Sequence, residues 1–115
     1  MFSYNDEYEM NIAEINGVII ACEEVEDDYE ELAQEIADKY LQKLDEIVQF
    51  LIDEGICEYF GEVTAEKIKS SLGKPLIDIE NQLVQYLEHT LDETHIIEFE
   101  YEDDFEEFSC MNIDG

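Results

Sequence analysis

The sequence predicts an α+β fold, with residues 1–115 forming a single domain. Apolar and polar residues alternate near both ends of the chain, which is the period of a β-strand. In the middle, apolar residues recur at i, i+3, i+4 and i+7, which is the period of an amphipathic helix. We therefore expect an N-terminal β-hairpin, a long amphipathic helix, a short helix and a four-stranded antiparallel meander, with the helices on one face of the sheet.

The expected hairpin turns at Asn16-Gly17, a dipeptide whose two residues both tolerate the positive φ of a tight two-residue turn. Residues 8–15 alternate before it, as a half-buried strand does. The return strand, residues 18–22, is apolar without a break. This pattern predicts a strand that is buried on both faces.

The expected long helix begins in an acidic segment. Asp28 and Glu31 have the spacing of a capping box, which satisfies free backbone N–H groups of the first turn. Gly55 is a natural stop. About 26 residues at 1.5 Å each would give a helix of about 40 Å, long enough to cross the whole domain. Its apolar face would comprise Leu32, Ile36, Tyr40, Leu41, Leu44, Ile47, Val48 and Leu51.

A short second helix and the meander complete the expected fold. Thr64 is placed to cap the helix, which would end at Leu72-Gly73 just before Pro75. The four strands of the meander are expected at residues 76–80, 83–90, 95–102 and 105–113, with turns at 81–82, 91–94 and 103–104.

The charge balance restricts the possible partners. Thirty-three Asp and Glu face five Lys, and the formal net charge is −28. Such a chain repels itself, which costs stability. Binding to nucleic acid or to anionic lipid needs an excess of Lys and Arg, so we expect neither a nucleic-acid nor a membrane partner. A partner attracted by this field should itself be basic.

Several further features indicate a cytoplasmic protein. The chain has no apolar run of about 18 residues, which predicts no membrane span. Its first residues lack the basic region and apolar stretch of a signal peptide. Cys22, Cys57 and Cys110 are scattered and odd in number, as is typical of free thiols in a reducing compartment.

The sequence offers no catalytic motif, so we expect neither an enzyme nor a cofactor. Nucleophile motifs and Gly-rich phosphate loops are absent. The acidic stretch lacks the spacing and the glycine of a calcium loop, so no specific metal site is expected there. His89 and His95 could approach each other across a turn and form a zinc site with Glu88 or Asp92. No clear third and fourth ligands are present, however, and we expect no metal here.

The most unusual stretch is "EFEYEDDFEEF", residues 98–108. In a strand, Glu98, Glu100 and Glu102 would share one face, about 7 Å apart, with aromatic residues on the other face over the helix. A net charge of −28 exceeds that of an ordinary small domain, and a partner that benefits from the field would explain it. The candidate partner-binding residues are this row, the acids that follow it and a second patch on the long helix: Glu98, Glu100, Glu102, Asp103, Asp104, Glu106, Glu107, Asp38, Asp45 and Asp53.

The C-terminal 45 residues resemble a family of small bacterial domains without an established chemistry. The resemblance rests on "LGKP", "ID", "YLEHTLD", "HIIEFEY" and "IDG", which are residues 72–75, 77–78, 86–92, 95–101 and 113–115. In size, charge and compartment such domains are similar to the acidic immunity proteins encoded beside polymorphic toxins. The resemblance implies binding to a basic toxin, and it carries over no residue role.

Three hypotheses follow for the function. In the first, the chain is an immunity or inhibitor protein that neutralises a basic protein such as a toxin. In the second, it is a DNA mimic whose carboxylates stand in for phosphates against a DNA-binding protein. In the third, it is a structural or oligomer-forming domain whose charge is incidental. We expect a monomer or a homodimer, and the sequence does not choose between them.

Overall fold

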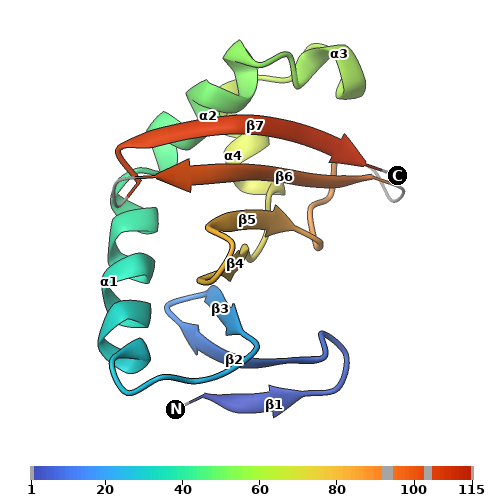
Figure 1. Ribbon diagram of the computed structural model, residues 1–115. Coiled ribbons are helices and arrows are strands. Elements are labelled where there is room, and N and C mark those ends of the chain that lie inside the picture. Colours follow the sequence, from blue (N-terminus) through green and yellow to red (C-terminus); the bar gives the residue numbers. More distant parts are fainter. Residues whose placement is uncertain (1, 92–94, 103–104, 115) are drawn as a thin grey trace.

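The computed structural model describes residues 2–91, 95–102 and 105–114 and shows an α+β fold (Figure 1). Within this part of the chain, seven strands form one sheet in the order β1-β2-β3-β4-β5-β6-β7. The strands are β1 (Ser3–Asn5), β2 (Met10–Ile15), β3 (Val18–Cys22), β4 (Leu76–Asp78), β5 (Leu83–Tyr86), β6 (Ile96–Glu102) and β7 (Glu107–Asp114). The helices are α1 (Tyr29–Gln42), α2 (Leu44–Asp53), α3 (Cys57–Phe60) and α4 (Ala65–Ser71).

The expected hairpin is present as β2 and β3. Asn16 and Gly17 have φ values of 51° and 83°, as the tight turn requires. The burial of β3 on both faces is also confirmed, because all five of its residues are buried. β1 was not expected, because three residues are too few to show an alternating pattern.

The four-stranded meander is part of a larger sheet. β4 to β7 are antiparallel neighbours, as expected. However, β3 pairs with β4 in parallel, with Ile19 opposite Leu76 and Ile20 opposite Ile77, so the hairpin and the meander form one sheet. The prediction treated them as separate units because this pairing joins segments that are far apart in the sequence.

The prediction of a single long helix is wrong. α1 and α2 are separate helices, and Lys43 lies between them at φ −100° and ψ 6°. Lysine is an ordinary helix former, so the composition gave no sign of a break. The apolar stripe stays in phase through Leu44, which packs against the core. Leu41, counted on the apolar face, is 43% exposed.

The expected helix caps have different outcomes. The Asp28 side chain makes no capping hydrogen bond to α1, so the predicted capping box is wrong. The cap of α4 is confirmed, because the Lys67 backbone N–H donates to Thr64 Oγ1 at 3.1 Å.

The main core lies between the helices and one face of the sheet. Its largest fully buried side chains are Tyr86, Phe99 and Phe105. A second, smaller cluster lies on the opposite face, where Ile19, Ala21 and Leu76 are covered by Tyr8, Met10 and Ile12. Helices therefore cover one face of the sheet, as predicted, and we call the opposite face the open sheet face.

Candidate functional site

The acidic row of β6 lies on the open sheet face. Ile97, Phe99 and Tyr101 are buried in the main core with the helices. Because successive side chains of a strand point to opposite faces, Glu98, Glu100 and Glu102 face away from the helices. The expected orientation of this strand, with aromatic residues inward and acids outward, is therefore confirmed.

The three glutamates of this row have different surroundings. Glu98 is half-buried and accepts hydrogen bonds from Gln85 Nε2 at 3.1 Å and Asn112 Nδ2 at 3.2 Å. Glu100 and Glu102 are exposed. In residues 2–91, 95–102 and 105–114, none of the ion pairs joins a lysine to any of the three. The row therefore keeps its negative charge uncompensated.

Glu107 extends this row across to β7. It lies directly opposite Glu102 in the sheet, and such cross-strand partners point to the same face. Like charges directly opposite each other destabilise a sheet, and a bound cation would relieve the repulsion. We call Glu98, Glu100, Glu102 and Glu107 the acidic row.

The remaining candidates of the acidic stretch lie elsewhere. The carboxylate of Glu106 is 3.5 Å from Lys43 Nζ, at the junction of α1 and α2, so it is bound to the helix layer. Sequence alternation could not show this, because the lysine comes from a distant segment. Asp103 and Asp104 lie outside the described residues.

The second patch does not join the acidic row. Asp38, Asp45 and Asp53 are exposed on α1 and α2, in the layer on the other side of the sheet. Lys69 Nζ lies 2.8 Å from Asp45, which compensates its charge. Gln34 and Gln49 donate amide hydrogen bonds to Asp38 and Asp53. These three aspartates are therefore spread along the helices.

An apolar half of the open sheet face was missed. Tyr8, Met10 and Ile12 are half-buried there, on the β2 to β4 side of the sheet. Their alternation was visible in the sequence, but it did not show which face of the sheet they would occupy. The open sheet face thus combines an apolar half with the acidic row.

Both ring nitrogens of His89 take part in hydrogen bonds within the fold. His89 Nε2 lies 2.6 Å from the backbone oxygen of His95, and His89 Nδ1 accepts from the Leu91 N–H at 3.2 Å. This pattern corresponds to the neutral ring with its proton on Nε2. In the described part of the chain, no three His, Cys, Asp or Glu residues are placed to hold a metal ion. Asp92, suggested as a ligand in place of Glu88, lies outside that part.

The three cysteines are free thiols. Burial raises the pKa of the Cys22 thiol to about 11, which keeps it protonated. The Cys57 thiol lies 3.8 Å from the backbone oxygen of Val63, as a weak donor. Cys110 is exposed on β7.

No family model, curated protein or solved structure matches this chain. The similarity to acidic immunity proteins stays a prediction. No helix in the described residues is long and apolar enough to span a membrane.

Proposed function

We propose that this chain is a non-enzymatic acidic binding protein that docks a basic protein on its open sheet face. The observation that carries the proposal is the acidic row, whose carboxylates share one helix-free face without a lysine partner in the described residues. A row of this kind attracts Lys and Arg side chains and speeds the encounter with a basic partner.

The structure beneath the row supports this proposal. Phe99 is fully buried and contacts Phe50 and Phe108, with ring centroids 5.6 and 5.7 Å away. The strand that bears the glutamates is thus fixed from behind by packed rings. Because the backbone beneath the row is fixed, binding has to order only side chains, which favours affinity.

The apolar half of the same face supplies what charge alone does not. Electrostatic complementarity mainly raises the association rate and excludes wrong partners. Burial of apolar area slows dissociation, and Tyr8, Met10 and Ile12 offer such area beside the acidic row. A partner with a basic patch next to an apolar one would match both halves.

Inhibition of a toxin is the biological role that we propose for this surface. Its support is the acidic charge of the chain, together with the resemblance of residues 71–115 to a family of small bacterial domains that are similar to immunity proteins in size, charge and compartment. An inhibitor needs a surface and no catalytic group. A DNA mimic would present the same charge, and competition with DNA separates the two.

The experiment compares a variant of the row with a matched control. The triple variant Glu98→Gln, Glu100→Gln, Glu102→Gln and the control Glu31→Gln, Glu54→Gln, Glu62→Gln each remove three exposed or half-exposed charges. Association rates are measured at low and at physiological salt with the basic protein recovered by a low-salt pull-down from source cells. Duplex DNA is then added as a competitor for that protein.

We expect the row variant to stay folded and to associate about tenfold more slowly than the control variant at low salt, because steering depends on local charge. The difference should shrink as salt rises. Equal rates for the two variants would remove the row from the interface. If duplex DNA competes with this chain for the basic protein, the DNA-mimic hypothesis replaces the inhibitor hypothesis.

A further inference from the structure

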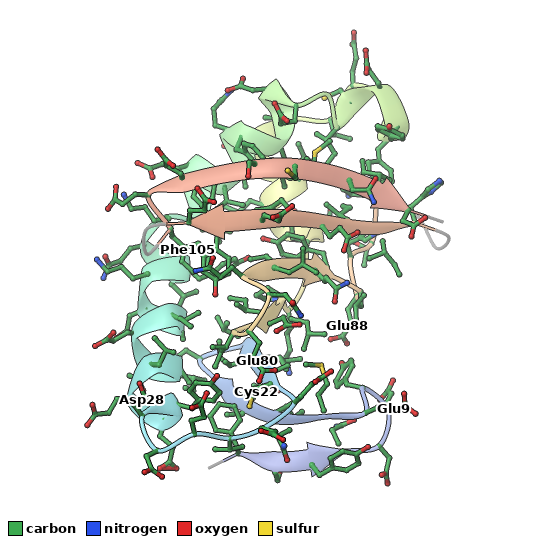
Figure 2. All side chains as sticks on the ribbon, viewed as in Figure 1. Glu9, Cys22, Asp28, Glu80, Glu88 and Phe105 are labelled. Atoms are coloured by element: carbon green, nitrogen blue, oxygen red, sulfur yellow. The ribbon has the colours of Figure 1, made fainter. Side chains whose placement is uncertain are left out.

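A cavity lies between α1 and the β6–β7 hairpin, away from the acidic row. Its volume is about 220 Å³, and its lining residues are Glu35, Ile36, Asp38, Lys39, Gln42, Tyr101 and Phe105. Figure 2 shows Phe105 at this junction, beside α1. Pockets for small molecules usually measure about 300–1,000 Å³, so this cavity suits a single side chain better than a cofactor.

The apolar part of the cavity is rigid. The rings of Tyr101 and Phe105 stack with centroids 4.2 Å apart and an interplanar angle of 6°. Ile36 completes the apolar lining. Tyr40 is not part of the lining, but its ring meets Phe105 edge-on at 6.1 Å and connects this wall to the buried core.

The mouth of the cavity is predominantly acidic. Glu35 and Asp38 are exposed and three positions apart on α1, which places their side chains about 5–6 Å apart on one helix face. Gln34 Nε2 donates to Asp38 at 3.1 Å and so orients its carboxylate. Lys39 brings one positive charge to the same rim, so the two carboxylates outnumber it.

We propose that this cavity receives an arginine side chain of the basic partner, an inference that rests on the proposed function. The methylene stem would lie at the apolar wall formed by Ile36 and Tyr101, while the guanidinium would bond to Glu35 and Asp38. Arginine fits better than lysine because its planar head is weakly hydrated and donates in a fork to two acceptors. Glu102 and Glu107 end the acidic row on the opposite face of the sheet from Tyr101, so the partner would reach round this end of β6 and β7, where the row would steer it and the pocket would anchor it.

The first experiment needs no partner. Amide chemical shifts of the ¹⁵N-labelled protein are followed while N-acetyl-L-arginine methylamide is added at physiological salt. The lysine and norleucine analogues serve as parallel probes. We expect saturable shifts confined to residues 35–42, Tyr101 and Phe105, with the arginine probe binding about tenfold more tightly than the lysine probe.

Three variants test the chemistry of the mouth. The double variant Glu35→Gln, Asp38→Asn should weaken the arginine probe about tenfold, because both charge-assisted bonds are lost. The matched control Glu31→Gln, Glu54→Gln should leave its affinity unchanged. Lys39→Gln should strengthen binding, because it removes the competing positive charge.

The outcomes separate this inference from the proposed function. Equal affinity for the lysine or the norleucine probe, or shifts spread over the whole acidic surface, would overturn the arginine pocket and leave the acidic row untouched. With the partner, the double variant should raise the dissociation rate, whereas the row variant lowers the association rate. A partner that binds the double variant with unchanged kinetics would overturn the anchoring role.

Discussion

The hydroxyl oxygens of Tyr40 and Tyr86 lie 2.7 Å apart in the core, where they join α1 to β5. Both side chains are buried, and no buried polar side-chain atom of the described residues lacks a hydrogen-bond partner. The two hydroxyls therefore satisfy each other, and one cannot be removed without consequence for the other.

We expect each single substitution, Tyr40→Phe or Tyr86→Phe, to cost about 1–3 kcal/mol of unfolding free energy, because the remaining hydroxyl stays buried without its partner. The double variant should cost much less than the sum of the two. Urea denaturation of all four proteins measures this coupling. Tyr59→Phe, at an exposed position, is the control and should be neutral. Additive costs would show that the two hydroxyls act independently.

Alkaline pH should unfold the protein through its tyrosines. Burial raises the pKa of Tyr40 to about 12 and that of Tyr86 well above its usual range, while a hydrogen bond to Glu26 raises that of Tyr29 to about 12. An unfolded tyrosine ionises near pH 10. The stability that these groups contribute is thus complete below pH 10 and is lost as the pH rises to about 12 and beyond.

The absorbance of tyrosinate tests this prediction. We expect the absorbance change of Tyr40 and Tyr86 to be delayed to a pH well above 10. These buried tyrosines should ionise together with the loss of the circular dichroism signal. A titration of all seven tyrosines near pH 10 with the fold intact would contradict it.

Salt should stabilise the protein. The molecule measures 43 × 29 × 22 Å and carries a net charge of −28. The Debye length is about 30 Å at 0.01 M salt and about 10 Å at 0.1 M, so repulsion across the molecule is screened over this range. We expect the melting temperature to rise clearly between these two concentrations. A flat or falling melting temperature in scanning calorimetry would show that the charge is compensated locally.

Lys43 should stabilise the folded protein more than an exposed surface lysine does. It is 23% exposed and lies 3.3 Å from Glu46 and 3.5 Å from Glu106, so it links the α1–α2 junction to the start of β7. The hydrogen bond to Glu46 raises the pKa of Lys43. Lys43→Met should lower the melting temperature more than Lys67→Met, which removes an exposed charge from α4.

The difference between these two lysine variants should narrow at high salt, because the interaction is electrostatic. Thermal melts at two salt concentrations provide the comparison. Equal losses for the two variants at low salt would mean that only the net charge matters.

The parts of the fold that could be read from the sequence are local. The turn at Asn16-Gly17 depends on two residues, and the facing of β6 depends on its own alternation. The break at Lys43 and the parallel pairing of β3 with β4 depend on contacts between distant segments, and no short stretch encodes them. For the same reason, the sequence predicts that Glu98, Glu100 and Glu102 share one face, because this depends only on local alternation. It does not predict the position of Glu106, because that depends on the distant Lys43.

The apolar half of the open sheet face could not be predicted from the sequence either. Ile12 lies opposite Ala21, and Ile19 opposite Leu76, so this half is assembled from three strands of two distant segments. The apolar residues of each segment are visible in the sequence, but nothing in either segment shows that the two lie side by side. These residues form a continuous surface only because β2, β3 and β4 are neighbours in the sheet.

The parallel pairing of β3 with β4 also determines how the chain can fold. Residues 23–75, which include all the described helices, form one loop that must close before these two strands meet. Closing so long a loop costs entropy before any contact repays it, whereas the hairpins on either side form locally. We therefore expect the β3–β4 seam to belong to the folding transition state. Ile77→Val should slow refolding in stopped-flow experiments, whereas Ile113→Val in β7 should mainly speed unfolding.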